Sequence, residues 1–219
     1  MFAVVAAVAR ARLILQSEFP YNIGARCINR EWFNLPMEEV WMIFCEELAK
    51  TIEKHNLLVH SFVLMSNHFH LIASTPKANI DRCMHQFMTK SSRRLTLRGN
   101  RINETFAGRH FKCILQHSNY YLNAYKYNYR NPVTAKICEY VEDYPYSTLQ
   151  MVIKKQKTIF QLAEDTTYMS DPVGTLKWLN TEPTSQNLEA VRYGLKRQYF
   201  ISKKYRNTNK YILTQDDLI

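Results

Sequence analysis

A chain of 219 residues has room for one well-packed core but hardly for a second full-size domain. Its net charge of +10 and its 14 tyrosines favour a nucleic-acid partner, because positive charge attracts phosphates and aromatic rings stack on bases; a basic protein that its charge merely keeps in solution is the alternative. Five irregularly spaced cysteines argue against a disulfide framework or a zinc ribbon and predict reduced thiols, and no stretch reaches the ~18–20 apolar residues of a membrane span.

The first part of the chain alternates strand and helix patterns. The N-terminal "MFAVVAAVARAR" has an apolar run without the basic residue that opens a signal peptide, so no secretion signal is predicted. β-Branched and aromatic residues predict a first strand over 21–33. After Pro36, apolar residues at every fourth position predict an amphipathic helix over 37–56. "LLVHSFVLMS" and "HFHLIAST" then predict two strands with a tight turn at Ser66 and Asn67.

A second helix, a strand and a third helix follow. Apolar residues at helical spacing predict a helix over 80–98, whose other face is rich in arginine and lysine. "RHFKCILQ" (109–116) predicts a strand, and "SNYYLNAYKYNYRN" (118–131) predicts a helix capped by Ser118 and ended by Pro132. This order of elements predicts an α+β fold, in which helices pack on one side of a mainly antiparallel central sheet.

The character of the sequence changes near residue 150. Residues 1–150 are predicted to form one domain, and residues 151–219 a basic, partly helical C-terminal extension that assists DNA binding. The extension ends in "LKRQYFISKKYRNTNKY", where aromatic residues interleave with lysines and arginines and no acidic residue occurs. A disordered basic tail is the alternative interpretation of this segment.

Two histidines stand out in "SNHFHLI". Residues i and i+2 of a strand point to the same face, about 7 Å apart along the chain, so His68 and His70 can converge on one ion. Phe69 between them would face the core. A histidine pair of this kind is also compatible with plain packing, and neutral imidazole binds many metals, so the pair alone selects neither a metal nor a function.

A second pattern occurs in "YKYNYRNPV". If this segment is helical, Tyr127 and Asn131 lie one turn apart on the same face. Rows of tyrosine more often form packing or stacking surfaces, so this pair too is ambiguous when it is taken alone.

Together these motifs resemble the single-tyrosine transposases of the HUH endonuclease superfamily, closest to the bacterial REP-associated tyrosine transposases. The family pattern is Met-x-Asn-His-hydrophobic-His-Leu followed further along by Tyr-x-x-x-Asn-Pro-Val, and this chain has "LMSNHFHLI" and "YNYRNPVTA" in that order. "GARCINREWF", "FAGRHFKCIL" and "EDYPYSTLQ" resemble the family's opening strand, its Gly-Arg-x-x-Lys strand and its closing segment. The resemblance covers about residues 20–150 and implies a ferredoxin-like HUH fold, with 1–150 as the catalytic domain.

The resemblance implies a metal-dependent DNA endonuclease and strand transferase. It makes Tyr127 the nucleophile and His68, His70 and Asn131 the metal ligands. Two imidazoles and an amide oxygen suit Mg²⁺ or Mn²⁺, which would polarise the scissile phosphate. Attack by the tyrosine would form a 5′-phosphotyrosine and free a 3′-OH, so that the strand can be rejoined without ATP.

Tyr125 and Tyr129 compete for the role of nucleophile. They lie two residues from Tyr127, so a helix turns them away from the face of Asn131, and the spacing of four residues selects Tyr127. Because a residue before proline avoids the α region, Asn131 is expected at the end of its helix.

The expected partner is single-stranded DNA with a hairpin, such as a repetitive palindromic element. The protein is expected to act as a monomer or a homodimer in the bacterial cytoplasm, associated with the nucleoid, and not to bind a membrane. A relative that binds hairpins without cutting them is the first alternative, and a hydrolase that uses metal-activated water is the second. The residues expected to contact the DNA backbone are basic: Lys90, Arg93, Arg94, Arg98, Arg109, Lys112, Lys196, Arg197, Lys203, Lys204 and Arg206.

Overall fold

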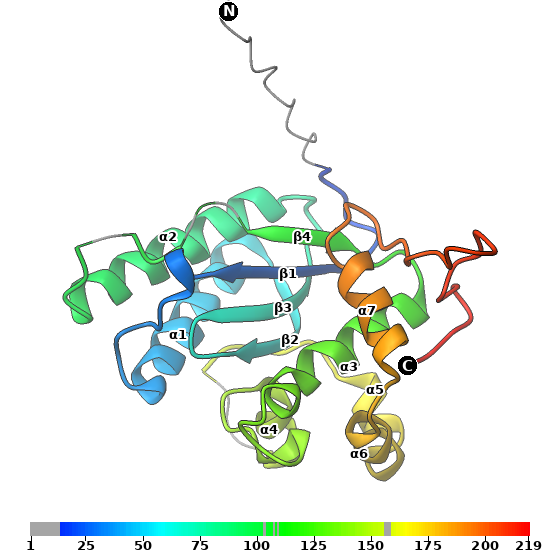
Figure 1. Ribbon diagram of the computed structural model, residues 1–219. Helices are drawn as coiled ribbons and strands as arrows, with labels where there is room; N and C mark the ends of the chain where they lie inside the picture. Colours follow the sequence, from blue (N-terminus) through cyan, green and yellow to red (C-terminus); the bar gives the residue numbers. More distant parts are fainter. Residues whose placement is uncertain (1–13, 103, 107, 109, 156–158) are drawn as a thin grey trace, which may run out of the picture.

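The computed structural model describes residues 14–102, 104–106, 108, 110–155 and 159–219, and its elements follow the predicted order (Figure 1). The apolar run at 1–12 and the predicted DNA contact Arg109 lie outside the described residues. The strands are β1 (Tyr21–Arg26), β2 (Leu58–Leu64), β3 (His68–Ser74) and β4 (Phe111–Ile114). The helices are α1 (Met37–His55), α2 (Ile80–Arg98), α3 (Ser118–Thr134), α4 (Thr148–Ile153), α5 (Thr166–Ser170), α6 (Pro172–Asn180) and α7 (Ser185–Gly194), with short 3₁₀ turns η1 (Ile28–Arg30) and η2 (Val141–Asp143).

The strands form one antiparallel sheet in the order β2-β3-β1-β4, which runs from bottom to top in Figure 1. β3 therefore lies in the interior of the sheet, between β2 and β1. In the register of β1 with β3, Gly24 lies opposite His70 and Arg26 lies opposite His68. The predicted α+β class with an antiparallel central sheet is confirmed.

Helices cover both faces of the sheet, whereas the sequence predicted helices on one side. Phe69, Leu71 and Ala73 of β3 belong to a core that includes Phe44 of α1, while Ile72 belongs to a second core with α3 and the C-terminal helices. Successive side chains of a strand point to opposite faces, so β3 carries apolar residues on both. A strand that is apolar on both faces requires cover on both, and this is why helices on one side do not suffice.

An aromatic cluster supports β3 from the side of α1 and α2. The ring of Phe44 lies 5.5 to 6.0 Å, between centroids, from the rings of Phe33, Phe62, Phe69 and Phe87. Tilted and edge-on aromatic pairs of this kind add to the free energy gained by burial. The cluster therefore holds rigid the strand that carries both histidines.

The C-terminal segment covers both edges of the sheet. Beside β4, the amide of Ile114 donates to the carbonyl of Gln198 (2.8 Å), and the amide of Phe200 donates to the carbonyl of Ile114 (3.0 Å). Beside β2, the amide of Ala163 donates to the carbonyl of Val59 (2.8 Å). These bonds occupy edge groups that would otherwise pair with another chain. Residues after 150 thus join the sheet and the second core, and the division into two domains at 150 stays a prediction.

The first strand is shorter than predicted. It ends at Arg26, not near residue 33, because Asn29 and Arg30 adopt left-handed backbone conformations with φ of 54° and 61°. Extended pairing cannot continue through such residues. The segment that follows β1 is therefore a tight, irregular loop.

Both predicted ends of α3 are also wrong. The N-cap position is His117, and Ser118 is the first helical residue. The helix continues through Pro132 to Thr134, since a proline this close to the C-terminus removes a single backbone donor. Asn131 consequently lies within the helix, one turn after Tyr127, and not at its end.

Candidate active site

The two histidines of β3 project from the same face of the sheet, towards α3, as the alternation of strand side chains predicts. Their ring centroids lie 5.1 Å apart, with the rings nearly perpendicular. Phe69 points to the opposite face, where its ring lies 5.7 Å from that of Phe44. One face of β3 thus carries the polar side chains of His68 and His70, and the opposite face packs in the hydrophobic core.

His70 is buried without a polar partner. Its side chain is 5% exposed, and among the described residues neither of its ring nitrogens has a hydrogen-bond partner. Burial, together with the nearby charges of His68 and Arg26, holds the pKa of His70 well below its usual value, so the ring is neutral. A buried polar group without a partner costs about 1–3 kcal/mol. A metal ion on one nitrogen would offset that cost, which plain packing does not.

His68 is held in one tautomer by its neighbour in the chain. Its Nδ1 lies 2.7 Å from Oδ1 of Asn67, and an amide oxygen only accepts, so Nδ1 carries the proton. The amide nitrogen of Asn67 in turn donates to the carbonyl of Arg30 (2.7 Å). Burial and the charge of Arg26 lower the pKa of His68 to about 4. The lone pair on Nε2 is therefore available to a metal ion.

The structure separates Tyr127 from the two tyrosines that compete with it. The hydroxyl of Tyr125 donates to Oδ2 of Asp165 (2.6 Å), and that of Tyr129 lies 2.9 Å from Oγ1 of Thr148. Both side chains are fully buried and face away from the histidines, against the segments that carry their partners. Tyr127 is half-buried, and its hydroxyl has no hydrogen-bond partner among the described residues.

Tyr127 lies against the histidine pair. Its ring centroid is 5.8 Å from that of His70, with the two rings nearly perpendicular. One turn later, Nδ2 of Asn131 donates to the carbonyl of Tyr127 (2.8 Å), which leaves Oδ1 as the atom that can serve as a ligand. A buried bond from Asn128 to Asn22 of β1 (2.8 Å) fixes α3 on the sheet. The four predicted members of the site thus come from two elements in contact.

Lys126, the residue before Tyr127, faces away from the histidines. Its ammonium lies 5.2 Å from the ring centroid of Trp178 in α6, and burial together with Arg130 lowers its pKa to about 8. Arg130 donates to the carbonyls of Leu179 (2.9 Å) and Asn180 (2.7 Å). This face of α3 holds the C-terminal helices and does not contribute to the candidate site.

The predicted ligands at the site, two imidazoles and one amide oxygen, are donors that a divalent cation can accept. In the part of the chain that the structure describes, no three histidine, cysteine, aspartate or glutamate side chains gather as a metal site. A metal at His68 and His70 must therefore take further ligands of another kind, and the amide oxygen of Asn131, one turn after Tyr127, is the candidate on α3. Mg²⁺ and Mn²⁺ accept imidazole and amide ligands and keep open positions for water and phosphate oxygens.

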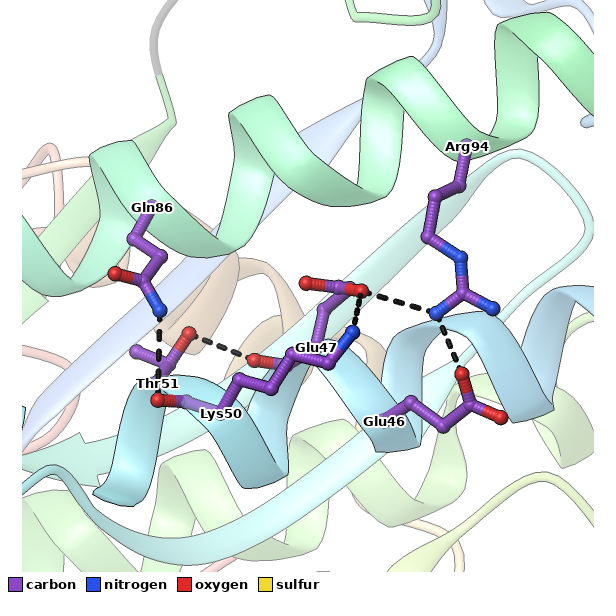
Figure 2. A network of polar contacts seen from close by, with 6 residues as sticks. All are labelled: Glu46, Glu47, Lys50, Thr51, Gln86 and Arg94. Carbon is purple, nitrogen blue, oxygen red and sulfur yellow. Dashed lines mark hydrogen bonds and ion pairs between the residues drawn. The ribbon is translucent and has the colours of Figure 1, made fainter. Parts of the chain in front are cut away.

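The basic residues of α2 lie across the sheet from the histidines, because α2 packs with α1 on the other face. Arg94 forms ion pairs with Glu46 (2.6 Å) and with the buried Glu47 (3.0 Å), and Glu47 also pairs with Lys50 (2.7 Å). Figure 2 shows this network bridging the two helices. A buried carboxylate requires such partners, so Arg94 has a structural role that the sequence did not predict.

The remaining cations predicted between residues 90 and 112 are also distant from the histidine face. Arg98 pairs with Glu39 of α1 (2.9 Å). Lys90 and Arg93 line a hollow of about 330 Å³ between α1 and α2. Lys112 lies on the edge strand β4. The fold does not gather these four side chains at the candidate site, and their contact with DNA stays a prediction.

The basic tail is folded back against the protein. The guanidinium of Arg197 stacks 4.4 Å from the ring centroid of Tyr193, and Lys203 pairs with Glu189 (2.8 Å). The other predicted DNA contacts of the tail are exposed: Lys196, Lys204 and Arg206.

Two residues beside the site were not predicted. Asn67 was assigned only a turn, although it directly precedes His68 in the motif. Arg26 faces His68 across the β1–β3 pair. It is the one charged residue of β1, and this feature of the sequence could have marked it as a residue of the site. Both act on the candidate metal ligands, one by a hydrogen bond and one by its charge.

The sheet order and the packed helices define an α+β protein with a four-stranded antiparallel sheet. The sequence profile of the family "Transposase IS200 like" matches residues 26–144, more than half of the chain. The chain therefore belongs to the IS200-like transposases.

Two solved structures are similar to this chain. A REP-associated tyrosine transposase bound to a REP hairpin covers 72% of this chain and 93% of its own, with a TM-score of 0.57 and 17% identity, which confirms the predicted fold. A candidate transposase from Deinococcus radiodurans covers 64% of this chain and 91% of its own, with a TM-score of 0.37 and 16% identity. No curated protein matches the chain. Among the described residues, no helix is both long and apolar enough to cross a membrane.

Proposed function

We propose that this protein is a metal-dependent endonuclease and strand transferase that cuts single-stranded DNA at or near hairpins. The observation that supports it best is the contact of the half-buried Tyr127 with His70, whose buried nitrogens have no hydrogen-bond partner among the described residues. Membership of the IS200-like transposases points to DNA strand transfer, and the similar fold of a transposase bound to a REP hairpin points to hairpin DNA.

His68, His70 and Asn131 would hold Mg²⁺ or Mn²⁺, which would draw electron density from the scissile phosphate and stabilise the charge that develops there. Oη of Tyr127 attacks phosphorus and the bond from phosphorus to the 3′ oxygen breaks, and the proton that the phenol gives up to water is matched by one that the leaving 3′ oxygen takes from water. The products are a 5′-phosphotyrosine and a free 3′-OH. Attack by another 3′-OH reverses the step and releases the tyrosine. One ester replaces another, so no ATP is consumed.

Residues 151–219 support the chemistry indirectly. They bury the far side of α3 and present exposed cations along the tail. We assign to these cations the sequence-independent attraction of the DNA backbone, which weakens as salt is raised.

The direct test is formation of a covalent complex. A single-stranded hairpin labelled on the product strand that begins with the new 5′ phosphate is incubated with the protein and Mg²⁺ or Mn²⁺, and then denatured. We expect a labelled protein–DNA band that a chelator prevents. Binding of the hairpin without any covalent band, over a series of hairpins with both flanks, would instead indicate a DNA-binding relative that does not cut.

Asn67 is predicted to position the metal ligand His68. Asn67→Ala removes the acceptor that fixes its tautomer, and loss of such outer partners typically lowers metal affinity 10- to 100-fold. Calorimetric titration with Mn²⁺ measures the change. Ser66→Ala, in the same turn, is the matched control, because no hydrogen bond of the Ser66 side chain occurs among the described residues. Equal affinities of the two variants would contradict the role of Asn67.

A further inference from the structure

One large aromatic side chain is exposed close to the histidines. Trp32 follows η1 and is 75% exposed, although its neighbour Phe33 is 1% exposed and packs in the aromatic core. A tryptophan left in water gives up the free energy that burial would contribute. An exposed one on a rigid backbone is therefore a candidate for binding.

The backbone around Trp32 is held from several directions. Its carbonyl accepts from Nη1 of Arg101 (2.7 Å), and that guanidinium also pairs with Glu31 (2.6 Å). The amide of Phe33 donates to the carbonyl of Ser66 (3.1 Å). The side chain of Asn34, whose φ is 61°, donates to the carbonyl of Gly99 (2.6 Å).

Left-handed residues at both ends of this short loop cost conformational energy that the tertiary bonds offset. The bonds fix the backbone and leave the indole free. The loop thus presents the Trp32 ring to solvent in a fixed place, with little ordering entropy left to lose on binding.

The same loop adjoins the turn that leads into His68. The amide of Cys27 donates to the carbonyl of Asn67 (2.8 Å), and Nδ2 of Asn67 donates to the carbonyl of Arg30 (2.7 Å). Figure 1 shows the end of β1, η1 and the β2–β3 turn together at one end of the sheet. Any strand that enters the histidine site from this end passes the loop.

The surface beside Trp32 is concave, and its lining includes residues of the loop and of the segment after α2. Arg30 and Trp32 line an open hollow of about 920 Å³, with Ile102 fully exposed at its rim. The carboxylate that lines it, Glu31, is neutralised by Arg101. Arg30 in the lining and Arg26, which lies outside it opposite His68, are both exposed, and within the described residues neither forms an ion pair. The hollow therefore combines an apolar platform with Arg30, which forms no ion pair within the described residues, and Arg26 lies nearby at the end of β1.

We propose that this hollow binds an unpaired base of the DNA strand beside the cleavage site, with the base stacked on Trp32 and the adjoining phosphates near Arg26 and Arg30. The inference rests on the proposed function, because it takes the strand at the histidines to be DNA. Stacking on an aromatic side chain accepts any base. The hollow would therefore require a single-stranded flank without fixing its sequence.

The test compares two labelled DNA probes by fluorescence anisotropy in the presence of a chelator, so that no strand is cut. One probe is a hairpin with a single-stranded flank of about ten nucleotides, and the other is the same hairpin with blunt ends. Trp32→Ala is expected to weaken binding of the flanked probe by about 5- to 150-fold and to leave the blunt probe unchanged. Trp32→Phe keeps an aromatic face and should retain most of the affinity.

Tyr140→Ala is the control for loss of an exposed aromatic ring, since Tyr140 is 46% exposed and lies after α3, outside the hollow. Because the Trp32 side chain is exposed, its removal leaves the core intact, and urea unfolding of the variant verifies this. Equal binding of the flanked probe by Trp32→Ala and wild type would overturn the inference. An equal loss on both probes, or a wild type that binds both alike, would overturn it too.

A second readout separates this inference from the proposed function. Covalent complex formation by wild type is measured with Mg²⁺ on the flanked probe. If Trp32→Ala binds the flanked probe more weakly and wild type forms no covalent complex, the base-binding role of the hollow is supported and the endonuclease activity is contradicted. If wild type forms the covalent complex and Trp32→Ala binds the flanked probe as wild type does, the endonuclease activity is supported and the base-binding role of the hollow is contradicted.

Discussion

Tyr127→Phe is expected to reduce the covalent protein–DNA complex to background while hairpin binding persists. The substitution keeps the ring that lies 5.8 Å from His70 and removes only the hydroxyl. Because that hydroxyl has no hydrogen-bond partner among the described residues, its loss should change the free energy of unfolding by less than about 0.5 kcal/mol. The measurement is the denatured-gel assay for labelled protein with Mg²⁺ or Mn²⁺, alongside anisotropy for binding.

Tyr125→Phe and Tyr129→Phe are matched controls on the same helix. Each removes a hydroxyl that bonds to a buried group, Asp165 or Thr148, and should cost about 1–3 kcal/mol of stability because the partner loses its bond. Each folded variant should still form the complex. Cleavage that persists in Tyr127→Phe would favour a metal-activated water as the nucleophile. A complex lost only in Tyr125→Phe or Tyr129→Phe would place the nucleophile elsewhere on α3.

The core of the candidate site was predictable because its spacings are local. Strand alternation places His68 and His70 on one face, and a helical turn places Tyr127 beside Asn131, whatever the rest of the fold does. The contact between the two pairs required the resemblance to a family, since no local rule states which helix covers β3. The structure places Tyr127 of α3 against His70, and α3 bonds to β1 at Asn22.

The surroundings of the site were not predictable from local patterns. Helical periodicity shows that Arg94 and Arg98 share a face of one helix, but it does not show that this helix lies across the sheet from the histidines or that both arginines pair with α1. The loop that exposes Trp32 depends on left-handed residues and on bonds to distant carbonyls. Strand propensity alone extended β1 through that loop. Both features, the ion pairs of the arginines and the shape of the loop, depend on contacts between residues far apart in the sequence.

His70→Leu is expected to abolish the metal response of the protein without destabilising the metal-free fold. The substitution replaces a buried imidazole whose nitrogens have no partner among the described residues with an apolar side chain of similar size. When a chelator is present, the free energy of unfolding of His70→Leu should equal that of wild type or exceed it by about 1 kcal/mol, because the unpaired nitrogens are removed. With Mn²⁺, only wild type should show a rise in melting temperature.

The rate at which His70→Leu forms the covalent complex should be on the order of 1,000-fold lower than that of wild type, since a metal contributes several kcal/mol of transition-state stabilisation. His60→Leu is the matched control. His60 is also a histidine of the sheet whose pKa burial lowers, but its Nε2 lies 2.8 Å from Oγ of Ser74. Its replacement should reduce stability and preserve the Mn²⁺ response. If both variants instead lose stability and keep that response, His70 is a packing residue and not a ligand.

The pH dependence of the metal-free protein gives an independent check with a definite sign. The folded-state pKa of His68 is lowered to about 4 and that of His70 is held well below its usual value, whereas both titrate near 6.5 in the unfolded chain. Below pH 6.5 the unfolded chain therefore binds protons that the folded protein does not, and stability falls as the pH drops towards 4. Urea midpoints between pH 7 and 4 should decline less steeply in His70→Leu than in wild type. Parallel profiles would mean that His70 already has a partner in the folded protein, and the case for a metal ion at that position would lose its main support.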